Sequence, residues 1–178
     1  AADVFSNPKD FALRRGAAYQ AYYENMPIRA SALMQGLANL RALNTGAEMR
    51  IYQRVDVGQL ASLYMLDTRQ YRDRQACSKD GKYGASLVNP EQCPNWLDPK
   101  RTLLGARQEA WLEAQFAKAK QRGQTWNVMA QSTLFGLRDN KPGDGMSFFN
   151  DGWDGYPQAR TKLTDALQKH AVSNPVML

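Results

Sequence analysis

The sequence predicts an α/β fold whose centre is a pair of parallel strands joined by a helix. Two short apolar runs, residues 60–66 and 126–131, are expected to be strands, and an amphipathic segment at 105–122 lies between them. A strand, a crossover helix and a second strand in this order make a βαβ unit. At 178 residues the chain is long enough for one domain with a core and too short for two, so we expect a single domain over 1–178.

The composition argues against two classes of protein. The net charge of +6 comes from Lys and Arg scattered among acids, without a run of about five like charges, so no dedicated nucleic-acid surface is predicted. No stretch approaches the roughly 18 apolar residues of a transmembrane helix, so no membrane span is predicted. Because residue 1 is Ala rather than Met, we expect the sequence to begin inside a longer precursor.

The first expected element is a helix over 7–26. Asn7 and Pro8 suit an N-cap and the first helical position, and Pro27 ends the pattern. Its apolar and aromatic residues share one face: Phe11, Ala18, Tyr19, Tyr22 and Met26. Such a stripe is typical of a buried face, and the alternative is an aromatic binding surface. The stretch 28–47 has mixed signals and predicts no element.

The next two elements are expected to pair as a hairpin. Residues 49–57 alternate between uncharged and mostly charged side chains, which predicts a half-exposed strand. A short link joins this strand to the run 60–66, so we expect the two to be antiparallel. The run 60–66 is rich in bulky side chains and bounded by Gly58 and Asp67, which favours a strand covered on both faces.

A cluster of polar residues directly follows the run 60–66: Asp67, Thr68, Arg69, Tyr71 and Arg72. Ligands of open α/β sheets bind just past the carboxyl ends of the strands, so these residues fall where binding groups are usually found. Two simpler alternatives stay open. Asp67 could be a turn or capping residue, and Arg69 and Arg72 could be solvated side chains.

Cys77 and Cys93 lie in one long, loop-like region that is rich in glycine and proline. Two thiols alone cannot form a structural zinc site, and neither belongs to a C-x-x-C pair. The alternatives are a disulfide, which implies an oxidising compartment such as the periplasm, and a pair of free buried thiols. Closing a loop of this size would contribute roughly 3 kcal/mol.

The segment 105–122 predicts a helix with one buried face and Gly123 as its C-cap. The residues of that face are Gln108, Trp111, Leu112, Gln115, Phe116 and Ala119. The strand that follows places Gln131 and Ser132 at the same end of the sheet as Asp67, because the strands of a βαβ unit are parallel. Gln131 is therefore a candidate substrate-binding residue.

Asp151 and Asp154 follow a glycine-rich loop, and two interpretations of them stay open. They could ligate a hard cation such as calcium, although the spacing of an EF-hand is absent, or they could make turns and cap a helix. The sequence holds no P-loop, no dinucleotide fingerprint, no nucleophile elbow and no second histidine. From the residues alone no complete catalytic group is predicted.

Two more elements are expected at the end of the sequence. A helix is predicted at 157–171, and a third parallel strand at 174–178. The only histidine, His170, lies on the inner face near the end of this helix, where a cation favours the helix dipole. We expect His170 not to be catalytic.

Three stretches carry a more specific signal: 17–27 (AAYQAYYENMP), 66–72 (LDTRQYR) and 151–160 (DGWDGYPQAR). The helix start at Leu104-Gly105 with Gln108 and Trp111-Leu112, and the strand at 126–131, fit the same pattern. In order and spacing these segments resemble the PhoD-type alkaline phosphatases and phosphodiesterases, a family of the calcineurin-like metallophosphatase superfamily. The resemblance covers most of the chain.

The resemblance implies that residues 1–178 are the central part of one metallophosphatase domain, a sheet sandwich flanked by helices with iron and calcium at its strand ends. The family's metal ligands come from an acidic and histidine-containing segment upstream and a Gly-Asp-x-His segment downstream, and neither is in this sequence. No metal ligand can therefore be placed here, and we expect this part alone to be inactive. The alternative is a non-catalytic, secreted module that binds anions or has a structural role.

The family's reaction is metal-assisted hydrolysis of a phosphate ester, in which nearby cations stabilise the developing charge. Arginine suits that role because its planar fork binds phosphate through two donors. Arg69 is the first candidate to bind substrate, followed by Arg72 and Tyr71, whereas Asp67 and Asp154 are expected to be structural.

The family is exported through the twin-arginine route. The resemblance therefore favours a disulfide between Cys77 and Cys93 and a periplasmic or secreted location. An open sheet edge would also favour self-association or pairing with the rest of the domain.

Overall fold

The structure is a computed structural model that describes residues 8–26, 50–78 and 86–178. The chain forms two compact units, Ala1–Ile51 and Tyr52–Leu178. The expected N-cap Asn7, residue Met49 and the stretch 28–47 lie outside the described residues.

The first unit contributes helix α1, Pro8–Asn25, where a helix was expected. The prediction of a buried apolar face is wrong for Phe11, Tyr22 and Met26, which are 39%, 43% and 48% exposed. Helical spacing shows which side chains share a face, but it does not show whether other residues cover that face. Among the described residues, the buried clusters are built from the second unit.

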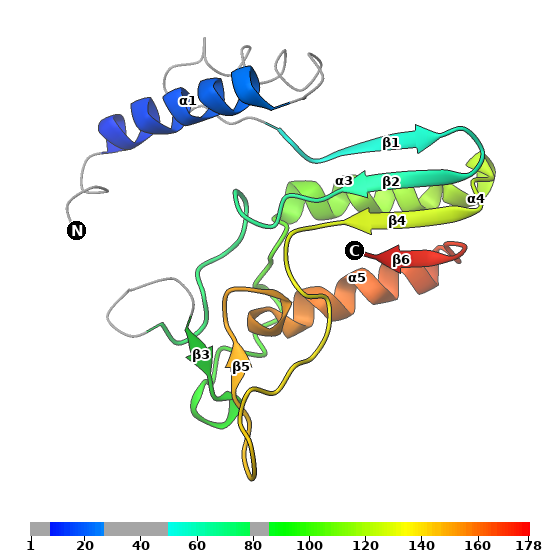
Figure 1. Cartoon of the computed structure of the whole chain (residues 1–178). Coiled ribbons are helices and arrows are strands. Elements are labelled where there is room, and N and C mark those ends of the chain that lie inside the picture. The colour runs from blue at the N-terminus through cyan, green and yellow to red at the C-terminus, as the bar shows by residue number, and fades with distance from the viewer. Residues whose placement is uncertain (1–7, 27–49, 79–85) are drawn as a thin grey trace. The chain divides into compact units, whose positions relative to one another are not determined.

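The second unit is built around a four-stranded sheet with the order β1-β2-β4-β6 (Figure 1). The strands are β1 (Gln53–Val57), β2 (Ala61–Met65), β4 (Trp126–Ala130) and β6 (Pro175–Met177). β1 and β2 form the expected antiparallel hairpin, which turns at Gly58 with a φ of +52° that glycine adopts readily. β4 runs parallel to both β2 and β6, so the predicted βαβ arrangement is confirmed.

Two crossover helices cover one face of this sheet: α3 (Ala106–Ala117) and α5 (Pro157–Lys169) (Figure 1). Tyr64 of β2 and Phe116 of α3 are fully buried, and their rings meet edge to face with 5.5 Å between centroids. Met129 of β4 is buried in the same cluster. Burial of these side chains is the main force that holds the helices on the sheet.

The helix expected over 105–122 is divided in two at Lys118. The second part is a single turn, α4 (Ala119–Arg122), and Gly123 caps it in the left-handed conformation with a φ of +74°, as predicted. Gln108, Leu112, Phe116 and Ala119 are buried on the predicted face.

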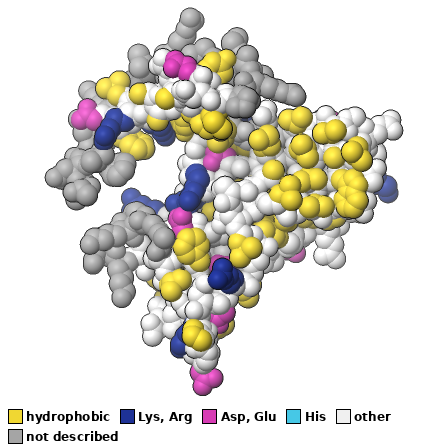
Figure 2. Space-filling view, in the orientation of Figure 1, with side chains coloured by type: hydrophobic (Ala, Val, Ile, Leu, Met, Phe, Trp, Pro, Cys, Tyr) yellow, Lys and Arg dark blue, Asp and Glu magenta, His cyan; other side chains and the backbone are white. Residues whose placement is uncertain are grey.

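The opposite face of the sheet carries exposed apolar side chains. Side chains alternate along a strand, so the neighbours of buried Tyr64 point away from the helices. Val57, Met65 and Trp126 lie on this opposite face and are 47%, 44% and 44% exposed. Figure 2 shows hydrophobic side chains gathered over these strands. The prediction that 60–66 is covered on both faces is therefore met only on the helix side, because apolar composition does not identify what covers a strand.

A second, two-stranded sheet pairs β3 (Leu87–Val88) with β5 (Phe148–Phe149). Two residues are too few to give a periodic pattern, so neither strand was predicted. Val88 and Phe148 pack with Ala76 and Cys93 in a separate buried cluster, which supports the loops after β2 and β5. The α/β class is confirmed. Within the described ranges, none of the helices combines the length and the hydropathy that a transmembrane segment requires.

Candidate functional site

The carboxyl ends of β2, β4 and β6 lie at one end of the sheet, because these three strands are parallel. We call this end, where the strands stop, the carboxyl edge. The first residues past the strands meet there. The hydroxyl oxygens of Thr68 and Ser132 are 2.8 Å apart, and the amide of Leu66 donates to the carbonyl of Ala130 at 2.8 Å. This edge is where ligands bind in open α/β sheets.

Asp67 orders the exit of β2. Its carboxylate accepts the backbone N–H groups of Arg69 at 2.9 Å and of Gln70 at 3.0 Å, and also the side-chain amide of Gln70 at 2.5 Å. The hydrogen bonds of the Asp67 carboxylate named here all lie within this turn, and the residue is only 3% exposed. The side chain of Arg69, which follows in this turn, is 58% exposed, and the structural role of Asp67 stays a prediction.

Gln108 of α3 is hydrogen-bonded to the backbone of Asp67. The fully buried amide accepts from the Asp67 N–H at 2.8 Å and donates to the Asp67 carbonyl at 2.8 Å and the Leu104 carbonyl at 2.9 Å. Sequence reasoning placed Gln108 on the buried face but gave it no role. An amide among apolar positions of a helix is a signal that a backbone group needs a partner.

Asp151, in the loop after β5, joins three side chains that follow β2. Arg69 Nη1 is 2.7 Å from Asp151 Oδ2, and Arg72 Nη1 is 2.7 Å from Oδ1 and 3.2 Å from the carbonyl oxygen. Gln75 Nε2 donates to Oδ1 at 2.6 Å. The structure therefore brings together two of the predicted site residues, Arg69 and Arg72, and adds two that the sequence did not identify as a group.

The environment of Asp151 favours its charged form. Burial alone would raise the pKa of this carboxyl, but the hydrogen bonds and charges of Arg69 and Arg72 outweigh burial and hold the pKa below its usual range. The Asp151 side chain is 12% exposed, that of Arg72 21% and that of Arg69 58%. Arg69 is thus the most exposed of these three side chains, although Asp151 anchors its guanidinium.

Asp154 is committed to a different set of partners. Its carboxylate pairs with Arg160 Nη1 at 2.9 Å and accepts the backbone N–H of Arg138 at 3.1 Å, and the residue is 5% exposed. Both acids considered as calcium ligands are therefore paired with arginine. Within the described residues there is no group of three or more His, Cys, Asp or Glu side chains arranged to hold a metal ion.

Gln131 lies at the predicted edge, at the end of β4. Its amide oxygen accepts from Trp153 Nε1 and from the Thr133 N–H, each at 3.0 Å, and its amide nitrogen donates to the carbonyls of Leu178, at 3.1 Å, and of Thr133. These bonds tie the exits of β4 and β6 to the loop after β5. Contact with substrate stays a prediction for this residue.

Tyr71 is held between an aromatic ring and a glycine. Its ring meets that of Tyr52 edge to face at 5.7 Å. Gly105, just before α3, has a φ of +76°, and a Cβ atom built on it would lie 2.6 Å from the Tyr71 Cβ. Glycine is required at 105 for both reasons, and its presence fixes the position of Tyr71 next to the arginines.

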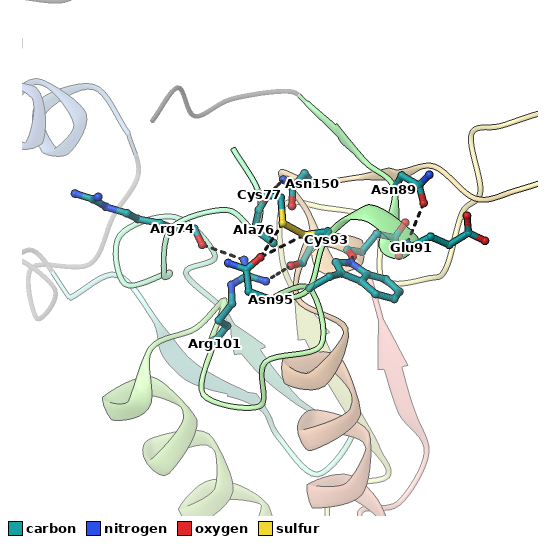
Figure 3. Close-up of a disulfide and its surroundings, with 12 residues drawn as sticks. Arg74, Ala76, Cys77, Asn89, Glu91, Cys93, Asn95, Arg101 and Asn150 are labelled. Carbon is teal, nitrogen blue, oxygen red and sulfur yellow. Dashed lines mark hydrogen bonds between the residues drawn. A yellow bond between two sulfur atoms is a disulfide. The ribbon is translucent and has the colours of Figure 1, made fainter. Parts of the chain in front are cut away.

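The predicted disulfide between Cys77 and Cys93 is present, with 5.7 Å between the Cα atoms (Figure 3). Next to it, the amide nitrogen of Asn150 donates to the carbonyl of Ala76 at 2.7 Å. Arg101 bridges the same two segments, since its guanidinium donates to the carbonyls of Arg74 at 2.9 Å and of Gly155 at 2.8 Å. The bonds of Asn150 and Arg101 fasten the segment that carries Gln75 to the loop that carries Asp151, and the disulfide ties the same segment to Cys93.

His170 lies far from this edge, at the C-cap of α5. Its Nε2 is 3.5 Å from Glu113 Oε1, which also pairs with Lys169 Nζ at 2.6 Å. Because α5 starts at the carboxyl edge of the sheet and runs back to the opposite edge, His170 does not belong to the site.

Two cavities are relevant to ligand binding. One, of about 320 Å³, lies between the loops that follow β4 and β5 and is lined by residues that include Leu134, Arg138, Phe149 and Gly152. The other, of about 370 Å³, lies between α3 and α5, away from the strand ends. Only the first borders the loop that carries Asp151.

The chain is similar in sequence and fold to known proteins. The family model of the PhoD-like phosphatases matches residues 2–178. Alkaline phosphatase D of Bacillus subtilis (strain 168) is 38% identical over 168 residues, which are 94% of this chain and 25% of that protein. A solved structure described as "Structure of PhoD" covers 95% of this chain with a TM-score of 0.74 and 35% identity, and 28% of that structure's chain is matched.

The chain thus spans about a quarter of the length of the relatives that it matches. The match nevertheless extends over nearly every residue of this chain, and it includes the hairpin, the βαβ unit and the loop of Asp151. This chain belongs to the PhoD-like phosphatase family.

Proposed function

We propose that this chain is part of a phosphoric ester hydrolase and that Arg69 and Arg72 bind the phosphoryl group. The observation that carries the proposal is the pair of guanidinium groups fixed by one carboxylate at the carboxyl edge of the sheet. Each arginine binds the Asp151 carboxylate through its Nη1 atom. Within the described part of the chain, the Nε and Nη2 groups of both arginines have no hydrogen-bond partner, so each retains a pair of donors for phosphoryl oxygens.

Anchoring makes these donors suitable for catalysis. A guanidinium that is already held in place loses less side-chain entropy when it binds an anion. As negative charge builds on the phosphoryl oxygens in the transition state, two fixed cations stabilise it without having to reorganise. Tyr71 and Gln131 border the same edge and are proposed as further substrate contacts.

The family resemblance implies iron and calcium, and we propose that the reaction is metal-dependent. The described acids do not fit a metal site, because Asp151 and Asp154 are each engaged by arginine. When bound, such ions polarise phosphoryl oxygens and activate the attacking group. We propose that their ligands come from segments other than residues 1–178, which form the central part of one metallophosphatase domain, and that this part alone is inactive.

We also propose a periplasmic or secreted location. Support comes from the Cys77–Cys93 disulfide, because such bonds persist mainly in oxidising compartments. The outer edge of β6 has no partner strand among the described residues. Pairing there, with a second copy or with the rest of the domain, would satisfy its backbone groups.

A second candidate is a non-catalytic module that binds anions or has a structural role. It is favoured by the lack of a metal-ligand cluster in the part of the chain that the structure describes. The two candidates share the arginine pair and differ in whether hydrolysis follows binding.

Hydrolysis by the longer, metal-loaded protein separates the two candidates. We expect it to cleave p-nitrophenyl phosphate or bis-p-nitrophenyl phosphate, and we expect Arg69→Ala to lower kcat/KM by about 10- to 100-fold through loss of a charge-assisted contact. Lys118→Ala removes one exposed positive charge at the other end of α3 and should leave kcat/KM unchanged. A folded, metal-loaded protein that cleaves neither ester contradicts the hydrolase proposal.

A further inference from the structure

The cavity between the loops after β4 and β5 lies next to the arginine pair. Arg72 Nη1 binds the carbonyl oxygen of Asp151, which belongs to the peptide group that joins Asp151 to Gly152. Gly152 in turn lines the cavity. On the β4 side, Ser132 contacts Thr68 through its hydroxyl, and the next residue, Thr133, is also in the cavity wall. The cavity and the arginines therefore share their boundary.

Apolar side chains form part of the cavity wall, together with the polar residues Thr133, Arg138, Asn140 and Asp154. Leu134 is 59% exposed and Phe149 is 40% exposed, and both line the cavity. Gly152 adds no side chain, and a Cβ atom there would collide with the Thr133 hydroxyl. The volume of about 320 Å³ lies within the roughly 300–1,000 Å³ of small-molecule sites, which are mostly apolar with a few polar groups.

The charges around the cavity favour an anionic ligand. The Arg138 side chain is exposed on the cavity rim, and among the described residues no hydrogen-bond or ion-pair partner engages its guanidinium. The acid in the wall, Asp154, is neutralised by Arg160 and by the Arg138 backbone N–H. The cavity thus offers two exposed apolar side chains, Leu134 and Phe149, several polar groups and one available positive charge.

We infer that this cavity binds the organic group of the phosphate ester and selects esters whose alcohol carries an aromatic ring. The inference rests on the proposed function, in which Arg69 and Arg72 hold the phosphoryl group at the shared boundary. A ring between Leu134 and Phe149 removes apolar surface from water on both partners. Arg138, on the rim of the cavity, contributes a cation that can stack on the ring face.

Two non-hydrolysable probes test the inference on the chain itself. Methylphosphonate presents the phosphonate group alone, and phenylphosphonate adds a ring. Titration of each, followed by calorimetry, gives two dissociation constants and their ratio. We expect phenylphosphonate to bind about tenfold more tightly, as burial of part of a ring implies.

Variants test whether the preference for phenylphosphonate comes from the cavity. Leu134→Ser and Phe149→Ala should each bring the two dissociation constants to within about twofold of each other while leaving methylphosphonate binding unchanged. Phe149 belongs to β5, so Leu134→Ser, in a loop, is the variant that leaves the small sheet intact. Leu137→Ser is the matched control, because Leu137 is 61% exposed and does not line the cavity. It should retain the tenfold preference.

The outcomes separate this inference from the proposed function. Equal affinities for the two probes, or a preference that survives Leu134→Ser, overturn the inference, and methylphosphonate binding that is lost in Arg69→Ala then still supports the arginine site. A phenyl preference that is lost in Leu134→Ser, together with a methylphosphonate affinity that is unchanged in Arg69→Ala, supports the cavity and contradicts the arginine site. Failure of both probes to bind the folded chain overturns both.

Discussion

Arg72 binds Asp151 at two points, with Nη1 2.7 Å from the carboxylate oxygen Oδ1 and 3.2 Å from the backbone carbonyl oxygen. This double contact joins the loop after β2 to the loop after β5, and Arg69 reinforces it by binding the other carboxylate oxygen, Oδ2. A charged cluster therefore lies at the carboxyl ends of the strands, and its two arginines remain partly exposed to solvent.

Replacing Asp151 with Asn should destabilise the chain by about 1–2 kcal/mol, because hydrogen bonds between charged partners are lost. Urea unfolding at pH 7 measures this. Asp165→Asn is the control, since Asp165 is exposed on α5, and it should change the unfolding free energy by less than about 0.5 kcal/mol. Equal effects of the two substitutions would contradict the role of Asp151.

The stability of the chain should also depend on pH through the Asp151 carboxylate. The folded-state pKa of Asp151 is lowered, so its contribution is fully present above the unfolded pKa of about 4 and is lost as pH falls through the folded value. The difference in unfolding free energy between the unaltered chain and Asp151→Asn should therefore shrink between about pH 5 and pH 2. A difference that stays constant over this range would show that the carboxylate charge is not what stabilises the cluster.

Gly105→Ala should destabilise the chain more than Gly123→Ala. Both glycines have a φ between +70° and +80°, so both substitutions strain the backbone by about 1 kcal/mol. Only at Gly105 does the added Cβ meet a neighbour, 2.6 Å from the Tyr71 Cβ. The excess loss at Gly105, measured by thermal unfolding, reports the close approach of Tyr71, and equal losses would rule that contact out.

Gln108→Leu should lower the free energy of unfolding by about 2–4 kcal/mol, because the buried N–H and carbonyl groups of Asp67 lose their hydrogen-bond partner. Gln168→Leu, at an exposed position of α5, is the matched control. Equilibrium unfolding of both variants gives the comparison. If Gln108→Leu proves as stable as its control, the strand exit is not held by this amide.

Removing the disulfide should lower the unfolding free energy by about 3 kcal/mol, since the loop it closes spans a sequence separation of 16. Unfolding of the chain with and without dithiothreitol measures the effect. The variant with both Cys77→Ser and Cys93→Ser should be insensitive to the reductant. An unaltered chain that is equally insensitive would contradict a stabilising role for the bridge.

The main elements of the second unit could be predicted from the sequence, because they are local patterns. The alternation in β1, the apolar run of β2 and the amphipathic stretch of α3 each repeat over several residues, and parallel pairing follows from their order. β3 and β5 escaped prediction because two residues give no period. The apolar face of α1 was assigned to a core because spacing alone does not show what covers a face.

The candidate site was only half predictable. Arg69 and Arg72 follow a strand and so attract attention, but their partner Asp151 lies 82 and 79 residues away in sequence. That contact depends on the fold of the intervening loops and on the small sheet that supports them. Gln75 had no sequence signal, and Gln108 had one that only the structure explains, namely an amide required by the backbone of Asp67.

Whether the two arginines bind the phosphoryl group is tested by the affinity of the chain for inorganic phosphate, in the unaltered form and in the double variant Arg69→Ala/Arg72→Ala. With two guanidinium groups lost from the site, we expect the double variant to bind phosphate at least about 30-fold more weakly. The control Lys118→Ala/Lys120→Ala removes the same charge from exposed positions at the other end of the sheet and should change the affinity less than about threefold. Phosphate affinity that is the same in the two double variants would contradict binding of the phosphoryl group by the arginines.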